Sequence, residues 1–182
     1  ALWFAAQPET VVAVTGTSGK TSVTNFTRQI WQALGHKAIS LGTMGVEGDY
    51  SARLAHTTPE PVTLHRVLAE AAAAGVTHAA MEASSHGLDQ RRLDGVRVAA
   101  GAFTNFSQDH LDYHKDFDSY FAAKALLFSH ILEPGAAAVI CTDEPRGRET
   151  EAIARARGLR VTTYGRGEDC DLRILGQRYD AT

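Results

Sequence analysis

Cysteine is scarce in this sequence, and its two cysteines are far apart. Cys141 and Cys170 show no CxxC spacing in a chain of 182 residues. This usage predicts neither a disulfide scaffold nor a structural zinc site, and it fits a reducing compartment. We therefore expect a cytoplasmic protein.

The chain also lacks a strong charge imbalance and any long apolar run. Its formal net charge is -3, which does not predict a nucleic-acid-binding surface. No stretch approaches the roughly 20 apolar residues of a membrane-spanning helix. The opening stretch, ALWFAAQPET, has no basic segment and too short an apolar run for a signal peptide. We expect neither a nucleic-acid nor a membrane partner.

Hydrophobic residues make up 44% of the chain, enough for one sizeable core in a single domain. Short apolar or β-branched runs predict buried strands. These runs are Val11–Gly16, Lys37–Gly42, Thr77–Ala83, Val96–Asn105, Ala136–Thr142 and Leu159–Gly165. We expect Gly45–Thr58 to form a loop or an edge hairpin. For Asp169–Asp180 we expect one or two strands of a small, incomplete second sheet.

Helical spacing of apolar residues predicts helices between these strands. They span Thr21–Leu34, a segment opened by Pro61 and ended by Gly75, Asp116–Leu132, and a weaker segment between the last two strands. The stripe of the first helix consists of Val23, Phe26, Ile30 and Leu34. Alternating strands and helices predict an α/β fold, a mostly parallel sheet with helices on both faces. Ligands of such sheets bind beyond the carboxyl ends of the strands.

The first strand leads into TGTSGKTS, Thr15–Ser22, which has the features of a phosphate-binding loop. Its glycines let backbone N–H groups approach an anion, and the following helix N-terminus adds positive potential. Lys20 can reach the terminal phosphates, and Thr21 or Ser22 can offer a hydroxyl to Mg²⁺. The loop is a short GxxGKT, because Val14 occupies the place of the usual first glycine. An ordinary glycine-containing turn is the alternative.

Polar residues also follow the strand at Thr77–Ala83. Glu82 ends its apolar run, and a carboxylate there can help to hold Mg²⁺ or can simply be solvated. In the following SSHGLDQRR, Arg91 and Arg92 suit a substrate carboxylate or phosphate. The alternative is a polar surface loop.

A second cluster lies in NFSQDHLDYH, Asn105–His114. The i, i+4 spacing of His110 and His114 can hold zinc on a helix, with His86 as a third ligand. That would make the protein a zinc hydrolase. The plainer alternative is a helix-capping acid beside surface histidines.

Lys124 lies on the apolar stripe of the helix predicted at Asp116–Leu132, between Phe121 and Phe128. Burial lowers the pKa of a lysine by up to about 3–5 units. The side chain can reach out to the surface, pair with a carboxylate, or be chemically altered so that it loses its positive charge. From this segment alone, the first outcome is the commonest.

Taken together and in this order, these motifs resemble those of the Mur ligases, which build the peptide stem of bacterial peptidoglycan. The motifs are TGTSGKT, HTTPEP (His56–Pro61), MEASSHGLDQRR (Met81–Arg92), TNFSQDHLDYH (Thr104–His114) and YFAAK (Tyr120–Lys124). They look most like the members that add the third residue of the stem, meso-diaminopimelate or L-lysine. The resemblance extends from Val11 to about Cys141.

The resemblance implies a role for each matching residue. The ATP phosphates would be bound by Gly16, Thr17, Ser18, Gly19, Lys20, Thr21 and Ser22. Mg²⁺ would be held by Thr21, by Glu82 with His110, and by Lys124 carried as a carbamate. The UDP-muramoyl dipeptide would be contacted by Thr57, Thr58, Ser84, Gln90 and Arg92. The catalytic set would be Lys20, Glu82, His110 and Lys124. Many relatives have asparagine in place of Ser18, and we expect the serine to be tolerated.

The implied activity is ATP-dependent amide bond formation through an acyl phosphate. The implied substrates are the UDP-muramoyl dipeptide and a diamino acid, and we expect a monomer. We expect residues 1–10 to be a linker from an N-terminal domain. Residues 11–182 would form a truncated central ATP-binding domain without the C-terminal amino-acid-binding domain, unable to ligate alone. The alternatives are a folylpolyglutamate synthetase-like ligase, the zinc hydrolase, and a nucleotide-binding module without catalysis.

Overall fold

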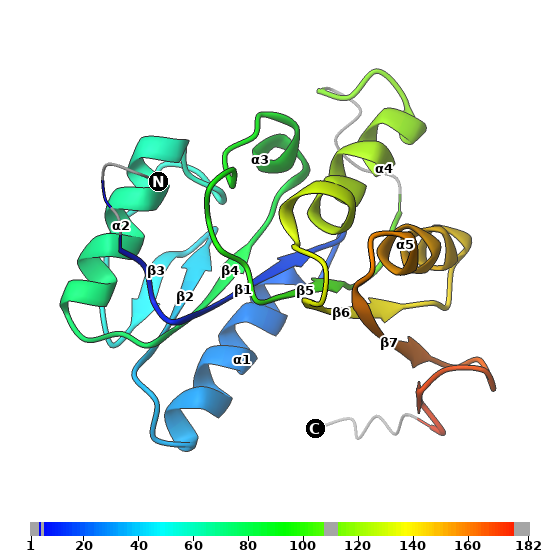
Figure 1. Ribbon diagram of the computed structural model, residues 1–182, viewed down its shortest axis with the longest axis horizontal. Coiled ribbons are helices and arrows are strands. Elements are labelled where there is room, and N and C mark those ends of the chain that lie inside the picture. The colour runs from blue at the N-terminus through cyan, green and yellow to red at the C-terminus, as the bar shows by residue number, and fades with distance from the viewer. Residues whose placement is uncertain (1–3, 5, 108–112, 177–182) are drawn as a thin grey trace, which may run out of the picture.

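The computed structural model describes Phe4 and residues 6–107 and 113–176, and it confirms the predicted strand–helix alternation (Figure 1). The strands are β1 (Thr10–Thr15), β2 (Ala38–Gly42), β3 (Gly45–Gly48), β4 (His78–Glu82), β5 (Ala100–Phe103), β6 (Ala137–Cys141), β7 (Arg160–Gly165) and β8 (Leu172–Arg173). Within the described residues they form one sheet in the order β3-β2-β4-β1-β5-β6-β7-β8. Every pairing is parallel except that of β2 with β3. That antiparallel pair is the predicted edge hairpin.

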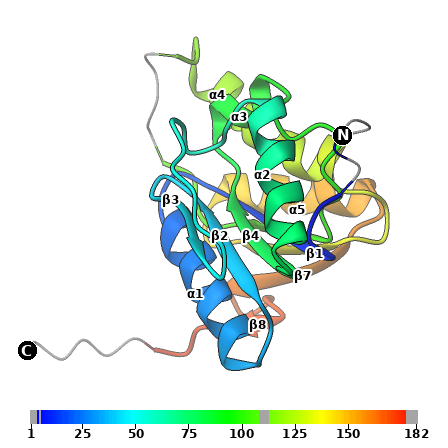
Figure 2. The ribbon, with the colours of Figure 1, turned by 90° about the vertical axis from the view of Figure 1, so that its left-hand side faces the viewer.

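Helices cover the two faces of this sheet unequally. The helices are α1 (Lys20–Ala33), α2 (Pro61–Ala73), α3 (Ser85–Asp89), α4 (Phe117–Leu126), the π-helix η1 (Leu127–Ile131) and α5 (Pro145–Ala156). Figures 1 and 2 show α2 to α5 on one face, which we call the closed face, and α1 on the other. None of the helices in the described residues is long and apolar enough to cross a membrane.

The closed face holds the hydrophobic core. Its largest fully buried side chains include Leu64 of α2, Phe103 of β5, Tyr120 of α4 and Phe128 of η1. The Phe103 and Phe128 rings meet edge to face, with centroids 6.3 Å apart. This is a favourable arrangement for the aromatic quadrupoles. The core therefore fixes α4 and η1 against the sheet.

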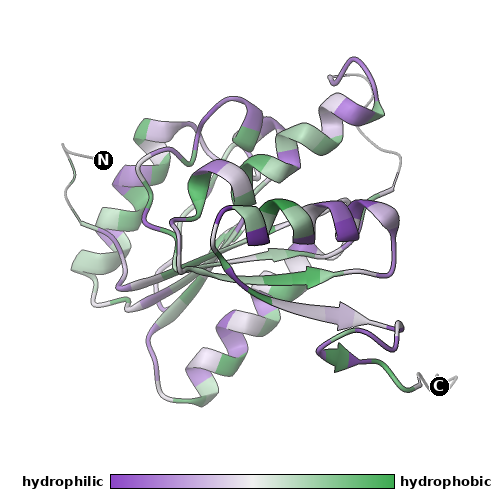
Figure 3. Cartoon of the chain, turned by 45° about the vertical axis from the view of Figure 1, so that its right-hand side comes forward, coloured by the Kyte–Doolittle hydropathy of each residue, from purple (hydrophilic) through white to green (hydrophobic). Residues whose placement is uncertain are grey.

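The first helix forms as predicted, but its apolar stripe lies away from the sheet. Phe26 and Ile30 are each 60% exposed and Leu34 is 69% exposed. The buried position of α1 is Thr24, which is about 100° around the helix from Val23 and so lies to one side of the stripe. In Figure 3, α1 lies alone on its side of the sheet with hydrophobic residues along its length. The inner side of α1 instead meets the strands through Arg28, which donates to Ser40, and Trp31, which lies against His78.

The predicted helix at Asp116–Leu132 is α4 followed by η1. Asp116 is its N-cap, and its side chain accepts a 2.7 Å hydrogen bond from the backbone N–H of Ser119. In return, the Ser119 hydroxyl accepts a 3.2 Å hydrogen bond from the Asp116 N–H. Such a capping box satisfies two backbone donors that a helix start leaves unpaired. The capping box explains why the helix starts where the sequence predicts.

The prediction of a second sheet near the C-terminal end is wrong for the residues described there. Leu172 and Arg173 pair in parallel with Tyr164 and Gly165 as the edge of the main sheet. The edge of β7 offers backbone donors and acceptors, and a following segment satisfies them most simply by pairing in register. The remainder of the predicted segment, residues 177–182, lies outside the described residues.

Candidate active site

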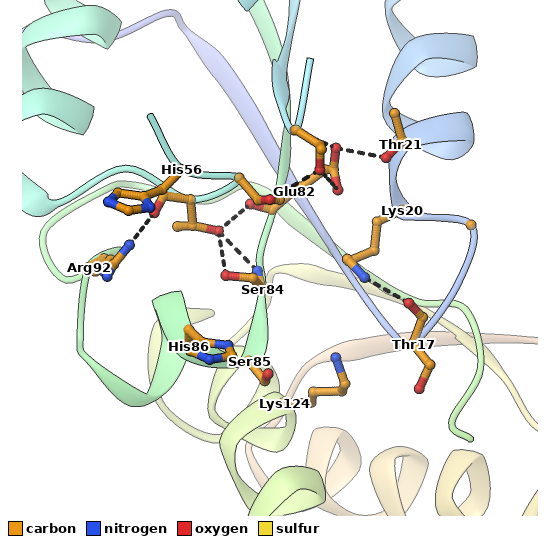
Figure 4. Close-up of a pocket in the computed structure, with 14 residues that line it drawn as sticks. Thr17, Lys20, Thr21, His56, Glu82, Ser84, Ser85, His86, Arg92 and Lys124 are labelled. Carbon is orange, nitrogen blue, oxygen red and sulfur yellow. Dashed lines mark hydrogen bonds between the residues drawn. The ribbon is translucent and has the colours of Figure 1, made fainter. Parts of the chain in front are cut away.

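A cavity of about 500 Å³ lies at the carboxyl ends of β1, β2 and β4 (Figure 4). A parallel sheet is expected to bind its ligand at this position. The cavity is lined by Thr17, Gly19, Lys20, Thr21, Thr43, His56, Thr57, Thr58, Glu82, Ser84, Ser85, His86, Arg92 and Lys124. Residues from five sequence segments therefore converge on one space, and most of them belong to the predicted site.

The phosphate-binding loop forms one wall of this cavity. Gly19 has φ +86° and is the N-cap of α1, a left-handed conformation that glycine adopts without strain. Because glycine has no side chain to cap the helix, the first amides of α1 are left for another acceptor, such as a phosphate. The Lys20 ammonium donates hydrogen bonds of 2.9 Å to the carbonyls of Gly16 and Thr17.

The two residues that follow β5 form hydrogen bonds with the phosphate-binding loop. The Thr104 hydroxyl donates a 2.7 Å hydrogen bond to the Ser18 carbonyl. The Asn105 side chain accepts from the Ser18 N–H at 2.9 Å and donates to its carbonyl at 3.1 Å. Ser18 does not line the cavity. Its backbone instead fixes the shape of the loop, which explains how the loop accommodates serine at this position.

Glu82 projects from the end of β4 and is 1% exposed. Its Oε1 accepts hydrogen bonds from the Thr21 hydroxyl at 2.9 Å and from the Thr43 N–H at 3.0 Å. Gly42 leaves the space for this carboxylate, since a Cβ there would lie 2.1 Å from Glu82 Oε1. The structure thus brings together two of the predicted Mg²⁺ ligands. A carboxylate and a hydroxyl are oxygen donors that suit this hard cation.

Lys124 extends from α4 into the same cavity (Figure 4). It is 1% exposed, so the alternative in which it reaches the surface is wrong. Its Nζ donates a 2.8 Å hydrogen bond to the Gly16 carbonyl and lies 4.5 Å from the centroid of the Tyr120 ring. A buried amine is therefore held against the phosphate-binding loop.

Thr58 connects the loop before α2 to the end of β4. It is 1% exposed, and its hydroxyl donates to the Glu82 carbonyl at 2.9 Å while accepting from the Ser84 N–H and the Ser84 hydroxyl at 3.0 Å. Arg92 Nη1 donates to the Thr58 carbonyl at 2.7 Å. These contacts give Thr58 a positioning role for Glu82 and Arg92. Its neighbour Thr57 lines the cavity as predicted.

Five described residues that were predicted to bind nucleotide or substrate do not line the cavity: Gly16, Ser18, Ser22, Gln90 and Arg91, which pairs with Asp94 instead. Gln90 Oε1 instead accepts hydrogen bonds from Arg92 Nε at 3.0 Å and from Arg92 Nη2 at 2.6 Å. Its Nε2 donates to the Tyr113 hydroxyl at 3.0 Å. Gln90 thereby orients the Arg92 guanidinium, which does line the cavity.

The three histidines considered as zinc ligands are not assembled in the part of the chain that the structure describes. His86 lines the cavity, His114 is 5% exposed, and their ring centroids lie 5.7 Å apart. His110 lies outside the described residues. Among the described residues, no three histidine, cysteine or carboxylate side chains form a group that could hold a metal ion.

Three residues that line the cavity were given no role from the sequence: Thr43, His56 and Ser85. Thr43 directly follows β2, so the rule that ligands bind beyond strand ends points to it. Ser85 is next to Ser84, and only its burial distinguishes the two. His56 lies in the HTTPEP motif, and no chemical pattern in the sequence indicates its position.

Comparisons with known proteins agree with this geometry. A family model for the Mur ligase middle domain matches residues 14–180. The chain is 56% identical over 170 residues to the UDP-N-acetylmuramoyl-L-alanyl-D-glutamate--2,6-diaminopimelate ligase of Bradyrhizobium diazoefficiens. This match covers 93% of the chain and 35% of the relative. The curated relatives it matches are thus much longer than this chain, which spans about a third of their length.

Solved structures show the same likeness. A structure of UDP-N-acetylmuramoyl-L-alanyl-D-glutamate--2,6-diaminopimelate ligase matches with a TM-score of 0.81 and 32% identity, covering 91% of this chain and 34% of that chain. The folylpolyglutamate synthase of Mycobacterium tuberculosis, complexed with ADP and AMPPCP, matches with a TM-score of 0.67 and 19% identity. That match covers 88% of this chain and 43% of the synthase, and it shows a shared fold alone.

Proposed function

We propose a function for this chain from the premise that it belongs to the Mur ligase family, as a middle domain. It is the ATP-binding part of a longer ligase that adds a diamino acid to UDP-N-acetylmuramoyl-L-alanyl-D-glutamate. The observation that carries this proposal is the convergence of the phosphate-binding loop, Glu82, Arg92 and Lys124 on one cavity. The names of relatives more than half identical to the chain supply the substrate.

The phosphate-binding wall suits the triphosphate of ATP. The open start of α1 at Gly19 offers backbone N–H groups and positive potential to the phosphates. Lys20 can turn from its loop carbonyls toward the terminal phosphate and offset its charge. Thr21 and Glu82 are the residues that would hold Mg²⁺, with His110 as a further proposed ligand. Bound Mg²⁺ neutralises charge on the transferring phosphoryl group.

The opposite wall suits the acceptor substrate. Arg92, held by Gln90 and the Thr58 carbonyl, presents a guanidinium that can bind a carboxylate or phosphate in two-point contact. Thr57 and Ser84 line the same side. The substrate carboxylate attacks the γ-phosphate to form an acyl phosphate and ADP. The amine of the incoming amino acid then displaces phosphate and forms the amide.

The resemblance assigns a carbamate to Lys124, and its surroundings suit that modification. The side chain is buried in the core yet reaches the cavity. A neutral amine can react with CO₂, and the product is an anion with two oxygens that can serve as a Mg²⁺ ligand. In this state Lys124 acts as a long acidic side chain beside the phosphate-binding loop.

A folylpolyglutamate synthetase-like activity is the second candidate, because that fold neighbour was solved in complex with ADP and AMPPCP. The identity of 19% supports a shared nucleotide-binding fold and no shared acceptor. We place the longer protein in the cytoplasm as a monomer. Residues 1–10 are its linker from an N-terminal domain, residues 11–182 are the central domain, and the amino acid is bound by a C-terminal domain.

The test uses the full-length protein and measures ADP release. We expect turnover with UDP-N-acetylmuramoyl-L-alanyl-D-glutamate plus a diamino acid, and none with a folate. Glu82→Ala should lower kcat by at least about 10²–10³-fold, the usual cost of losing one transition-state contact. Lys37→Ala, an exposed change outside the cavity, is the control. Turnover with the folate, or an unchanged rate in Glu82→Ala, contradicts the proposal.

Three further measurements address the remaining alternatives and the need for the other domains. Stoichiometric zinc in the purified protein would favour the hydrolase. Lys124→Ala should abolish ligation, with partial rescue by a short-chain carboxylate, and full activity in this variant contradicts the assigned carbamate. Amide product formed by the 182-residue chain alone would show that the other domains are dispensable.

A further inference from the structure

Ser85 carries a buried hydroxyl with no hydrogen-bond partner. The residue is 2% exposed, and its Oγ has no partner among the described residues. An unpaired buried hydroxyl costs about 1–3 kcal/mol relative to a paired one, so native structures almost always satisfy such groups. This cost indicates that the hydroxyl acquires a partner when the site is in its working state.

The surroundings of Ser85 restrict what that partner can be. Ser85 begins α3, which packs against α4, and it lines the cavity together with Lys124. Figure 4 shows Ser85 between His86 and Lys124. Its Oγ is closed to solvent, with less than 1 Å² accessible. Because this atom is enclosed, an acceptor on a neighbouring buried side chain can reach it more readily than a ligand in the open cavity.

A second unpaired hydroxyl belongs to the residue that precedes Gly16. Thr15 is fully buried, and its Oγ1 also has no partner among the described residues. It directly precedes Gly16, whose carbonyl accepts the 2.8 Å hydrogen bond from Lys124 Nζ. Thr15 shows that an unpaired hydroxyl also occurs beside the backbone that Lys124 contacts. The Ser85 hydroxyl, in contrast, shares the cavity with Lys124, which, unmodified, offers three N–H donors and no acceptor.

We propose that the Ser85 hydroxyl donates a hydrogen bond to the carbamate of Lys124. This inference rests on the carbamate in the proposed function. The neutral Lys124 amine forms a bond from nitrogen to the carbon of CO₂. One C=O electron pair moves onto oxygen, and the nitrogen releases a proton to water. The modified side chain then carries two acceptor oxygens that share one negative charge, and a charge-assisted bond from a hydroxyl is among the stronger hydrogen bonds.

Ser85 is therefore a positioning residue, distinct from its neighbour Ser84. The Ser84 hydroxyl is already engaged, since it donates to Thr58 Oγ1 at 3.0 Å and accepts from the Gly87 N–H at 3.1 Å. The Ser85 hydroxyl instead stabilises the carbamate against loss of CO₂ and fixes the direction of its oxygens. Its removal should weaken carbamate formation without disturbing the fold.

The experiment follows carbamate formation on the full-length protein by ¹³C NMR during titration with ¹³C-bicarbonate at fixed pH. The signal is assigned by its loss in Lys124→Met. We expect Ser85→Ala to raise the bicarbonate concentration at half-saturation about tenfold, the effect of one charge-assisted hydrogen bond. Ser129→Ala is the matched control, because this exposed hydroxyl donates to the Ala125 carbonyl on the same helical segment as Lys124 and lies outside the cavity. Its half-saturation point should match the wild type.

Thermal unfolding without bicarbonate provides the second readout. Ser85→Ala should unfold at the same temperature as the wild type or slightly higher, because it removes an unpaired buried hydroxyl. A midpoint lower by several degrees shows that the hydroxyl has a structural partner and overturns the inference. Equal half-saturation in Ser85→Ala and wild type also overturns it while leaving the carbamate in place. Absence of a Lys124-dependent signal in the wild type overturns both, whereas the ligase activity is tested separately by ADP release.

Discussion

Helices α1 and α4 have similar sequence patterns but opposite environments. Each has aromatic and aliphatic residues at helical spacing. In α4, Phe121 is 4% exposed and Lys124 is 1% exposed, whereas the stripe of α1 exposes Phe26 and Ile30 by 60% each. The N-cap of α4 is Asp116, which bonds Ser119, whereas that of α1 is Gly19, which has no side chain.

The difference shows that an apolar stripe predicts a helix without predicting what covers the stripe. α4 lies on the closed face, where its stripe packs into the core. α1 contacts the sheet through other side chains, such as Arg28, which donates to Ser40, and Trp31, which lies against His78. Its cap is open beside the cavity. Thus the helix whose N-cap has a side-chain hydrogen bond packs into the core. The helix whose N-cap is glycine has its N-terminus at the cavity.

The largest effect is expected when one phenylalanine in each helix is replaced by alanine. Phe121→Ala should lower the free energy of unfolding by about 3–5 kcal/mol, because it leaves a cavity in a packed core. Phe26→Ala should change it by less than about 0.5 kcal/mol, since this side chain is 60% exposed. Urea denaturation of both variants measures the two values. Similar losses in the two variants would mean that the stripe of α1 is covered in solution.

A smaller effect is expected when the lysine of each helix is replaced. Without bicarbonate, Lys124→Met should raise the free energy of unfolding by about 1 kcal/mol, because an apolar side chain of similar size replaces a buried polar one. The Gly16 carbonyl keeps Lys20 as a donor when Lys124 is replaced. Lys20→Met should have little effect on stability, because Lys20 is only partly buried. A clear destabilisation by Lys124→Met in urea denaturation would contradict this comparison.

The smallest effect concerns the caps. Hydrogen bonds from the backbone and then the side chain of Ser119 hold the pKa of Asp116 below its ordinary value of 3.8. A carboxylate whose pKa is lowered by folding stabilises the folded state when the pH is above its ordinary pKa. This stabilisation is lost as the pH falls through the folded-state pKa. Asp116→Ala should therefore lower the thermal midpoint by a few degrees at pH 7. The difference in thermal midpoint between this variant and the wild type should become smaller as the pH falls below about 4. A gap independent of pH would exclude the charge of Asp116 as the cause.

Much of the fold was predictable because the buried strands are short apolar runs and the longer helices that connect them have apolar residues at helical spacing. α3 was missed, since five residues, Ser85–Asp89, are too few to show a period. The pairing of Leu172 with β7 was also missed, because an edge strand is defined by a neighbour that the local sequence does not specify.

The site residues were predictable where a charged side chain lies at or just after the end of a predicted strand. Glu82 and Lys20 were found in this way, and the structure places both in the cavity. The contacts of Thr43 and Thr58 with Glu82 depend on segments that only folding brings together. The enclosure of the Ser85 hydroxyl is likewise a property of packing, which adjacent serines in a sequence do not reveal.

The Lys20 ammonium has a consequence for how tightly nucleotide binds. Its charge is already shared between the carbonyl oxygens of Gly16 and Thr17 at 2.9 Å. An arriving phosphate therefore exchanges existing hydrogen bonds for new ones, and only the difference between the two sets contributes to affinity. If the loop binds ATP as proposed, such an exchange favours the ligand with more negative charge, so Lys20 should contribute more to the binding of a triphosphate than to that of a diphosphate.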